Sequence, residues 1–172
     1  MFEILTAIAL GLPAAESAQP MLIGMLRDSD QQVRAAAAEA LGALGTPVPV
    51  DAIPALAALL RDGYWRVRHS ACVALEKLGE VSTPAATALL KVFREGTVNR
   101  QLAASALAAC GVVGVETLLV ILRETARASA QLRVSAVYGL SVVDPGAECA
   151  EAVVDALFET SKYHMLLVAC LS

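Results

Sequence analysis

The chain has few aromatic and few charged side chains for its length. Aromatic residues make up 4% of its 172 residues, with a single tryptophan, and Asp, Glu, Lys and Arg together make up 17%. A sheet-rich fold is disfavoured, because strands prefer aromatic and β-branched side chains. Hydrophobic residues make up 57% of the chain, many of them alanine, which excludes a disordered chain and favours packed helices.

Basic clusters and paired cysteines are also missing. The net charge of −4 argues against nucleic acid as a partner, because affinity for phosphates comes from clustered Lys and Arg. The four cysteines lie far apart and form no Cys-x-x-Cys pair, so we expect no metal site, no cofactor and no disulfide framework. We predict reduced, mostly buried thiols in a cytoplasmic protein. The cysteines are Cys72, Cys110, Cys149 and Cys170.

Catalytic and membrane-spanning patterns are likewise not found. The two histidines, His69 and His164, have no nucleophile and acid at a recognisable spacing, and no Gly-rich phosphate loop is present. No apolar run reaches the ~20 residues needed to cross a bilayer without a charge, Pro or Gly. Because Glu3 is the only early charge, we interpret Glu3–Leu10 as a helix of an N-terminal half-repeat (1–17) rather than as a signal peptide.

An arginine recurs at an almost constant distance. Arg34, Arg68, Arg100 and Arg133 are separated by 34, 32 and 33 residues, each within an Ala- and Leu-rich segment. A period of this length is typical of helical solenoids, in which each unit contacts only its neighbours. We therefore predict an all-α fold, a right-handed α-solenoid of about five antiparallel helical pairs.

Proline residues mark the expected starts of the first helices of the units. Pro20, Pro54 and Pro84 each precede a Leu that is followed by a basic residue, and proline is tolerated in a first helical turn. The expected first helices are Ala18–Arg27, Asp51–Arg61, Thr83–Arg94, Val112–Arg127 and Ala147–Thr160. The second helices are expected to begin near Asp30, Tyr64, Thr97, Ala130 and Lys162.

The second helices share one apolar stripe at helical spacing. In the second unit it is formed by Val67, Ala71, Leu75 and Leu78, and the other units repeat it. Gly45, Gly79 and Gly111 follow three of these helices, where a left-handed residue is commonly required.

A unit with a Pro-led helix, then Asp, then Val-Arg-x-x-Ala-x-x-Ala-Leu-x-x-Leu-Gly closely resembles the HEAT repeat, in particular the short form found in phycobiliprotein lyases. The resemblance covers repeats 18–45, 51–79, 83–111 and 112–144 and an incomplete last repeat, 147–172. It implies a fold far more specifically than a function, since proteins with HEAT repeats are mostly adaptors and scaffolds.

The resemblance also implies a role for the arginines. In the family, an Asp of the turn and an Arg of the second helix form a hydrogen-bonded ladder between adjacent units. Here the ladder would comprise Asp28, Arg34, Asp62, Arg68, Arg100 and Arg133, with Glu95 as the acid of the third unit. The alternative is an anion-binding stripe, and we favour the structural ladder because arginine–carboxylate pairs are strong when partly buried. Asn99 before the third Arg, and a longer turn before the fourth, predict that these units pack differently.

Partner binding is expected on the face left over. Trp65, His69, Cys72 and Glu76 share a second stripe, and Trp and Tyr are enriched at interface hot spots. The predicted partner-binding residues are Tyr64, Trp65, His69, Glu76, Gln31 and Gln101. The alternative for Trp65 is that it packs across the next turn.

Function is therefore predicted only as a class. We expect a non-enzymatic scaffold or adaptor that holds a protein or peptide on its concave surface. The alternative, which rests on resemblance alone, is a subunit of a bilin lyase or a related accessory factor. The last repeat stops part-way through its stripe and would leave an apolar face uncovered. We therefore expect either that the chain is a fragment of a longer repeat protein or that this uncapped C-terminal repeat packs against a partner or, by self-association, against a second copy.

Overall fold

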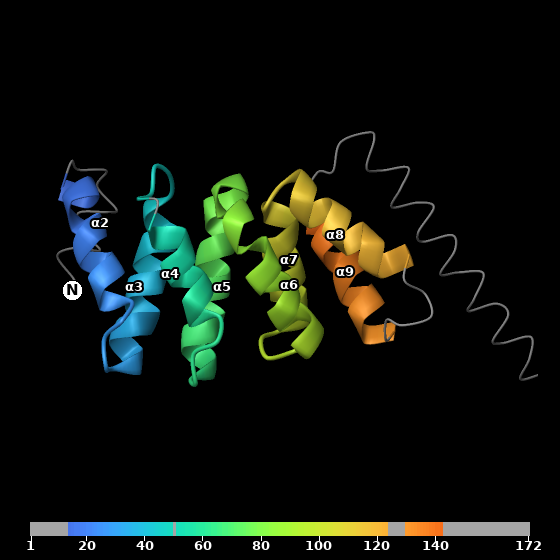
Figure 1. Cartoon of the computed structure of the whole chain (residues 1–172), viewed down its shortest axis with the longest axis horizontal. Coiled ribbons are helices and arrows are strands. Elements are labelled where there is room, and N and C mark those ends of the chain that lie inside the picture. The colour runs from blue at the N-terminus through green and yellow to red at the C-terminus, as the bar shows by residue number, and fades with distance from the viewer. Residues whose placement is uncertain (1–13, 50, 124–129, 143–172) are drawn as a thin grey trace, which may run out of the picture.

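The computed structural model describes residues 14–49, 51–123 and 130–142, which are helical throughout apart from the connecting turns. Within these ranges there is no β-strand. The helices form antiparallel pairs that follow one another in chain order along the long axis of the molecule (Figure 1). The first helices of the four pairs are α2 Ala14–Met25, α4 Ala52–Leu59, α6 Ala86–Glu95 and α8 Val112–Arg123. The second helices are α3 Gln31–Leu44, α5 Trp65–Leu78, α7 Arg100–Ala109 and α9 Ala130–Val142.

This arrangement confirms the predicted all-α solenoid. Four helical pairs lie within the described residues. The predicted fifth pair and incomplete last repeat, over 147–172, lie outside them, as does the predicted helix Glu3–Leu10. The repeat boundaries therefore stay predictions.

The apolar stripe of the second helices forms the core. Val67, Ala71 and Leu75 of α5 are completely buried, and Leu41 and Leu107 hold the same position in α3 and α7. Burial of this stripe removes a continuous strip of apolar surface from water, which is the main stabilising contribution in a solenoid whose units cannot fold alone.

Two helix boundaries differ from the expected ones in the first helices. α2 begins at Ala14, four residues before the predicted start and inside the segment assigned to the half-repeat, so Pro20 lies in the middle of the helix. Pro84 lies in a 3-10 helix, η1 (Gly79–Ala85), which precedes α6. Only Pro54 occupies a first turn, in α4. Proline position was therefore a poor guide to helix starts, because a capping residue or a 3-10 turn can precede it.

The start of α7 is the larger difference. α3 and α5 each begin three residues before their repeated arginine, but α7 begins at Arg100 itself, with Asn99 as its N-cap. The side chain of Asn99 accepts a hydrogen bond from the Gln101 N–H at 2.9 Å, which ends the turn at that point. The third unit therefore lacks the first helical turn that the first two units have, in agreement with the predicted departure at Asn99.

The second helices pack directly on one another, α3 on α5, α5 on α7 and α7 on α9. The first helices meet mainly through η1, which lies against α4, α5 and α7. α3 and α5 approach each other closely at Gly42, where a Cβ atom would lie 2.7 Å from the Ala74 Cα. A side chain larger than hydrogen has no room there, so this glycine sets the distance between the two helices.

Candidate functional site

The predicted recognition stripe is a free surface only at its N-terminal end, not over its whole length. Cys72 is completely buried, and its equivalents Ala38 in α3 and Ala104 in α7 are buried as well. These small residues form the seam between successive second helices. The prediction was wrong here because the sequence periodicity does not distinguish a face turned to solvent from a face turned to the next unit.

The N-terminal ends of the second helices remain accessible. Trp65, the first residue of α5, has 70% of its surface exposed, and Tyr64 before it has 52%. The ring of His69 meets the Trp65 ring edge-on with centroids 6.4 Å apart, and His69 is itself exposed. Gln31 and Gln101 lie at the corresponding ends of α3 and α7, Gln31 half-buried and Gln101 exposed. Trp65 therefore does not pack beneath the next turn, and five of the six predicted residues lie at or one turn from these helix ends.

Glu76, the sixth predicted residue, belongs to the seam instead. Its carboxylate accepts a hydrogen bond from the hydroxyl of Ser105 on α7. The carboxylate of Glu39 on α3 accepts one from Ser70 on α5 at 2.8 Å. Each carboxylate thus reaches across to the next second helix, a second set of polar links that the sequence analysis missed. The signal was present as a serine within each Ala-rich seam, in Ser70 and Ser105.

The first junction of the stack contains a complete arginine rung. Arg34 donates from Nε to Asp62 Oδ2 at 2.8 Å and from Nη2 to Asp62 Oδ1 at 3.0 Å, and Nη1 donates to the backbone oxygens of Asp28 and Ser29. Its guanidinium also lies over the Tyr64 ring, 5.8 Å from the centroid. Every donor group of Arg34 is therefore used within the chain.

The electrostatics of this rung follow from its hydrogen bonds. The bond to Asp62 raises the pKa of Arg34, outweighing the effect of burial. Burial alone would raise the pKa of Asp62, but the bonds from Arg34 and from the Tyr64 N–H lower it below its ordinary value of 3.8. The carboxylate of Asp28 makes no such rung and caps its own turn, accepting the Asp30 N–H at 2.8 Å.

The second junction has the arginine but not the carboxylate. Arg68 donates from Nη1 to the backbone oxygens of Asp62 and Gly63, as Arg34 does in its own turn. Its Nε, however, donates to the Thr97 carbonyl at 3.0 Å, and Nη2 has no hydrogen-bond partner within the described residues. The acid expected for the third unit, Glu95, forms an ion pair on its own helix instead, with its Oε1 3.7 Å from the Lys91 Nζ.

The last two arginines do not continue the ladder uniformly. Arg100 donates to Gln131 Oε1 at 3.4 Å, while its Nε is buried and has no hydrogen-bond partner among residues 14–49, 51–123 and 130–142. Arg133 is the fourth residue of α9, the place that Arg34 and Arg68 hold in α3 and α5. The predicted ladder is therefore complete at Arg34, altered at Arg68 and, as far as the described residues go, without a carboxylate at Arg100.

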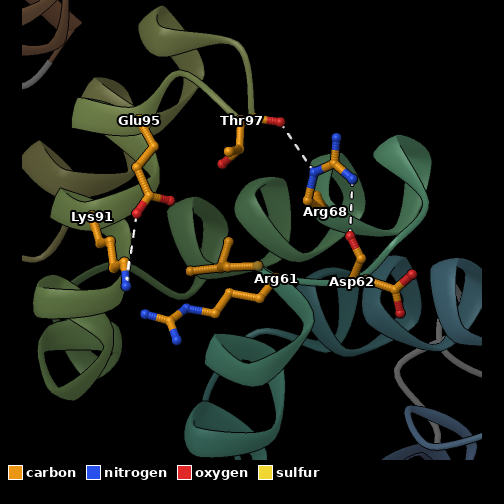
Figure 2. Close-up of a pocket in the computed structure, with 7 residues that line it drawn as sticks. Arg61, Asp62, Arg68, Lys91, Glu95 and Thr97 are labelled. Atoms are coloured by element: carbon orange, nitrogen blue, oxygen red, sulfur yellow. Dashed lines mark hydrogen bonds and ion pairs between the residues drawn. The ribbon is translucent and has the colours of Figure 1, made fainter.

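A pocket of about 450 Å³ lies at the second junction. Figure 2 shows its charged side chains around the space between α5 and α6, with the Asp62 carboxylate turned away from Arg68 and toward the first junction. The Arg61 side chain extends toward Lys91 (Figure 2) and has no hydrogen bond or ion pair with another described residue. The pocket is lined by Leu60, Arg61, Asp62, Arg68, Lys91, Glu95 and Thr97.

The two described thiols are unsuited to nucleophilic or metal chemistry. Cys72 and Cys110 are buried, as predicted, and burial raises the pKa of both. A thiol held in its neutral form is neither a good nucleophile nor a good ligand. In the described part of the chain, no group of three or more His, Cys, Asp and Glu side chains is placed to hold a metal ion. None of the helices described here combines the length and apolar character required to cross a membrane.

Comparison with known families agrees with the repeated geometry. Residues 3–52 match a family model described as HEAT repeats, and residues 52–82 match one described as HEAT repeat. No curated protein sequence matches the chain. The helical pairs continue the same arrangement beyond the matched residues to Val142. The matches and the stack of helical pairs together identify the chain as a HEAT-repeat protein.

Proposed function

We propose that the chain is a non-enzymatic scaffold that binds a protein or peptide across the N-terminal ends of its second helices. HEAT repeats generally serve protein interaction, and the finer assignment rests on Trp65. A tryptophan with 70% of its surface exposed leaves a large apolar area in water. Tryptophan and tyrosine at such positions are the residue types that most often dominate binding energy.

The surroundings of Trp65 support this proposal. Tyr64 adds a second exposed aromatic ring, and the polar side chains of Gln31 and Gln101 lie at the matching ends of the neighbouring second helices. An apolar centre with a polar margin is the usual composition of a protein interface. Because the second helices pack more closely than the first, they would line the inner side of a curved stack, which fits a partner on the concave surface.

The absence of a catalytic role is part of the proposal. His69 lies against Trp65 rather than beside a nucleophile, and the two buried thiols are held neutral. Cytoplasmic location, a protein rather than nucleic acid as partner, and the lack of a cofactor remain predictions from the sequence. Nothing in the geometry favours the bilin lyase alternative. The predicted self-association depends on residues 147–172, which lie outside the described ranges.

Trp65 provides its own test, because it is the only tryptophan of the chain. Peptides selected by display on the immobilised chain are expected to change its fluorescence on binding. Trp65→Ala should weaken their affinity at least tenfold, the loss of a hot spot of about 1.4 kcal/mol or more. Met21→Ala is the matched control, since Met21 is also an exposed large apolar side chain, on α2. Equal affinities for the two variants would refute the assignment of Trp65.

A further inference from the structure

The second junction carries a donor set that the chain itself leaves incomplete. At the first junction the Nε and Nη2 of Arg34 hold the two oxygens of Asp62. At the second, the Nε of Arg68 meets one carbonyl oxygen, that of Thr97, and its Nη2 has no hydrogen-bond partner among the described residues. The comparison between the two rungs shows which chemical group is absent from the second, a carboxylate.

The missing carboxylate follows from the shape of the third unit. Thr97 stands three residues before Arg100, as Gln31 and Trp65 stand before Arg34 and Arg68, but it lies in the turn and not in the helix. Its backbone oxygen is therefore free to accept from Arg68. Figure 2 shows its side chain directed into the pocket, on the side where Arg61 and Lys91 lie.

The charges of the pocket favour a single negative charge. Three cations line it, Arg61, Arg68 and Lys91, against the carboxylates of Asp62 and Glu95. Asp62 is already bound by Arg34, and Glu95 is paired with Lys91. The lining therefore has one positive charge in excess, and Arg61 and Arg68 are the cations left without a carboxylate of the pocket. The two carboxylates nearby would repel a doubly charged phosphate more than a carboxylate.

We propose that the pocket at the second junction binds an acidic side chain, Asp or Glu, of the protein partner, with Arg61 and Arg68 as the residues that hold it. This inference rests on the proposed function and names the chemistry of the bound segment. Trp65 begins the helix that carries Arg68, so one segment with an apolar residue near an acidic one would meet both. Arginine is well suited to this role, because its planar donors match a carboxylate.

The decisive variant adds to the chain itself the carboxylate that the second junction lacks. Thr97→Asp places a carboxylate in the pocket, and Thr97→Asn places an uncharged side chain of the same shape there. We expect Thr97→Asp to raise the melting temperature and to weaken the selected peptides about tenfold, a magnitude typical of a partly exposed charge pair. Thr97→Asn should bind them as the wild type does.

Two further experiments test the contributions of Arg61 and of the acidic residue of the peptides to binding. Arg61→Gln should weaken binding several-fold without loss of stability, because the Arg61 side chain is exposed and has no partner among the described residues. Arg66→Gln, at an exposed arginine outside the pocket, should leave binding unchanged. Replacing the acidic residue of each selected peptide by its amide should cost as much as Thr97→Asp. The loss should shrink as salt concentration rises.

The outcomes separate this inference from the proposed function. Peptides that depend on Trp65 but show no acidic preference, or that bind Thr97→Asp unchanged, would overturn the carboxylate pocket and leave the scaffold intact. If no peptide is selected, the proposed function fails, and titration with hexaglutamate against hexaglutamine tests the pocket alone. Shifts of the Arg61 and Arg68 Nε–H signals with hexaglutamate only would support the pocket, and their absence would refute it.

Discussion

The first and second junctions of the stack differ in the partner of the repeated arginine and in the contact between the second helices. At the first, Arg34 is bound by the Asp62 carboxylate, and the backbone of Gly42 lies close to Ala74. At the second, Arg68 meets a carbonyl oxygen, and the residue that corresponds to Gly42 is Glu76, which bonds Ser105. The first junction therefore satisfies its polar groups internally, whereas the second leaves donors facing a pocket.

The difference shows how a repeat protein can acquire a binding position without a new motif. α7 lacks the first helical turn, Arg94 stands six residues before Arg100 where Asp62 stands before Arg68, and the rung has a carbonyl in place of a carboxylate. Arg68 keeps a structural role, because it still donates hydrogen bonds to the two backbone oxygens of its own turn. A structural position in one unit thus becomes available for recognition in the next.

The largest expected effect concerns the close approach at the first junction. In Gly42→Ala the added Cβ would meet the Ala74 backbone, so α3 and α5 must separate, at a cost of about 1–3 kcal/mol. Urea denaturation measures it. Gly24→Ala is the control, because nothing lies within 4 Å of a Cβ there and alanine favours the helix. Equal stability of Gly42→Ala and the wild type would show that the junction does not depend on this approach.

A smaller loss is expected from the carboxylate of the first rung. Asp62→Asn removes the charge and one of the two oxygens that Arg34 binds, and should lower the melting temperature by a few degrees. Asp51→Asn is a matched control, because Asp51 is exposed and its side chain makes no capping bond. A drop of equal size in both variants would contradict the special role of Asp62.

The same pair of proteins gives a pH test. Since the pKa of Asp62 is lowered by folding, its contribution to stability is fully present above the ordinary value of 3.8 and is lost as the pH falls through the folded-state value. The stability difference between the wild type and Asp62→Asn should therefore be constant above pH 3.8 and shrink below it. A difference that grew on acidification would reverse the sign of this argument.

The smallest expected effects compare the serine links. Ser105→Ala should cost about 1 kcal/mol, because it leaves the half-buried Glu76 carboxylate without its bond. Ser70→Ala should cost less, since Glu39 is exposed and water can replace the hydroxyl. Denaturation of the two variants side by side measures the order. The opposite order would mean that these links matter more at the first junction.

Prediction from the sequence succeeded for the helices and only in part for the contacts between them, where the Arg34–Asp62 rung is present as expected. The stripe of Val67, Ala71 and Leu75 and the glycines after the helices depend on local periodicity, and both are where they were expected. The second stripe, with Cys72, was mistaken for surface because a solenoid helix buries two faces, one in its own pair and one against the next unit. For Trp65 the sequence left exposure and packing both open, and the structure places it exposed at the start of α5.

The repeat, the helical class and the buried seam were determined by the sequence, because helix propensity and apolar spacing act over a few residues and recur in every unit. The partner of each arginine was decided only by the tertiary structure. A rung joins groups about 30 residues apart, Arg34 to Asp62 and Arg68 to Thr97, so its acceptor depends on where the turn of the next unit comes to lie. The step from Arg68 to Arg100 is two residues shorter than the one before it, and only the folded chain shows that this shift brings a carbonyl to Arg68 and leaves a pocket beside it.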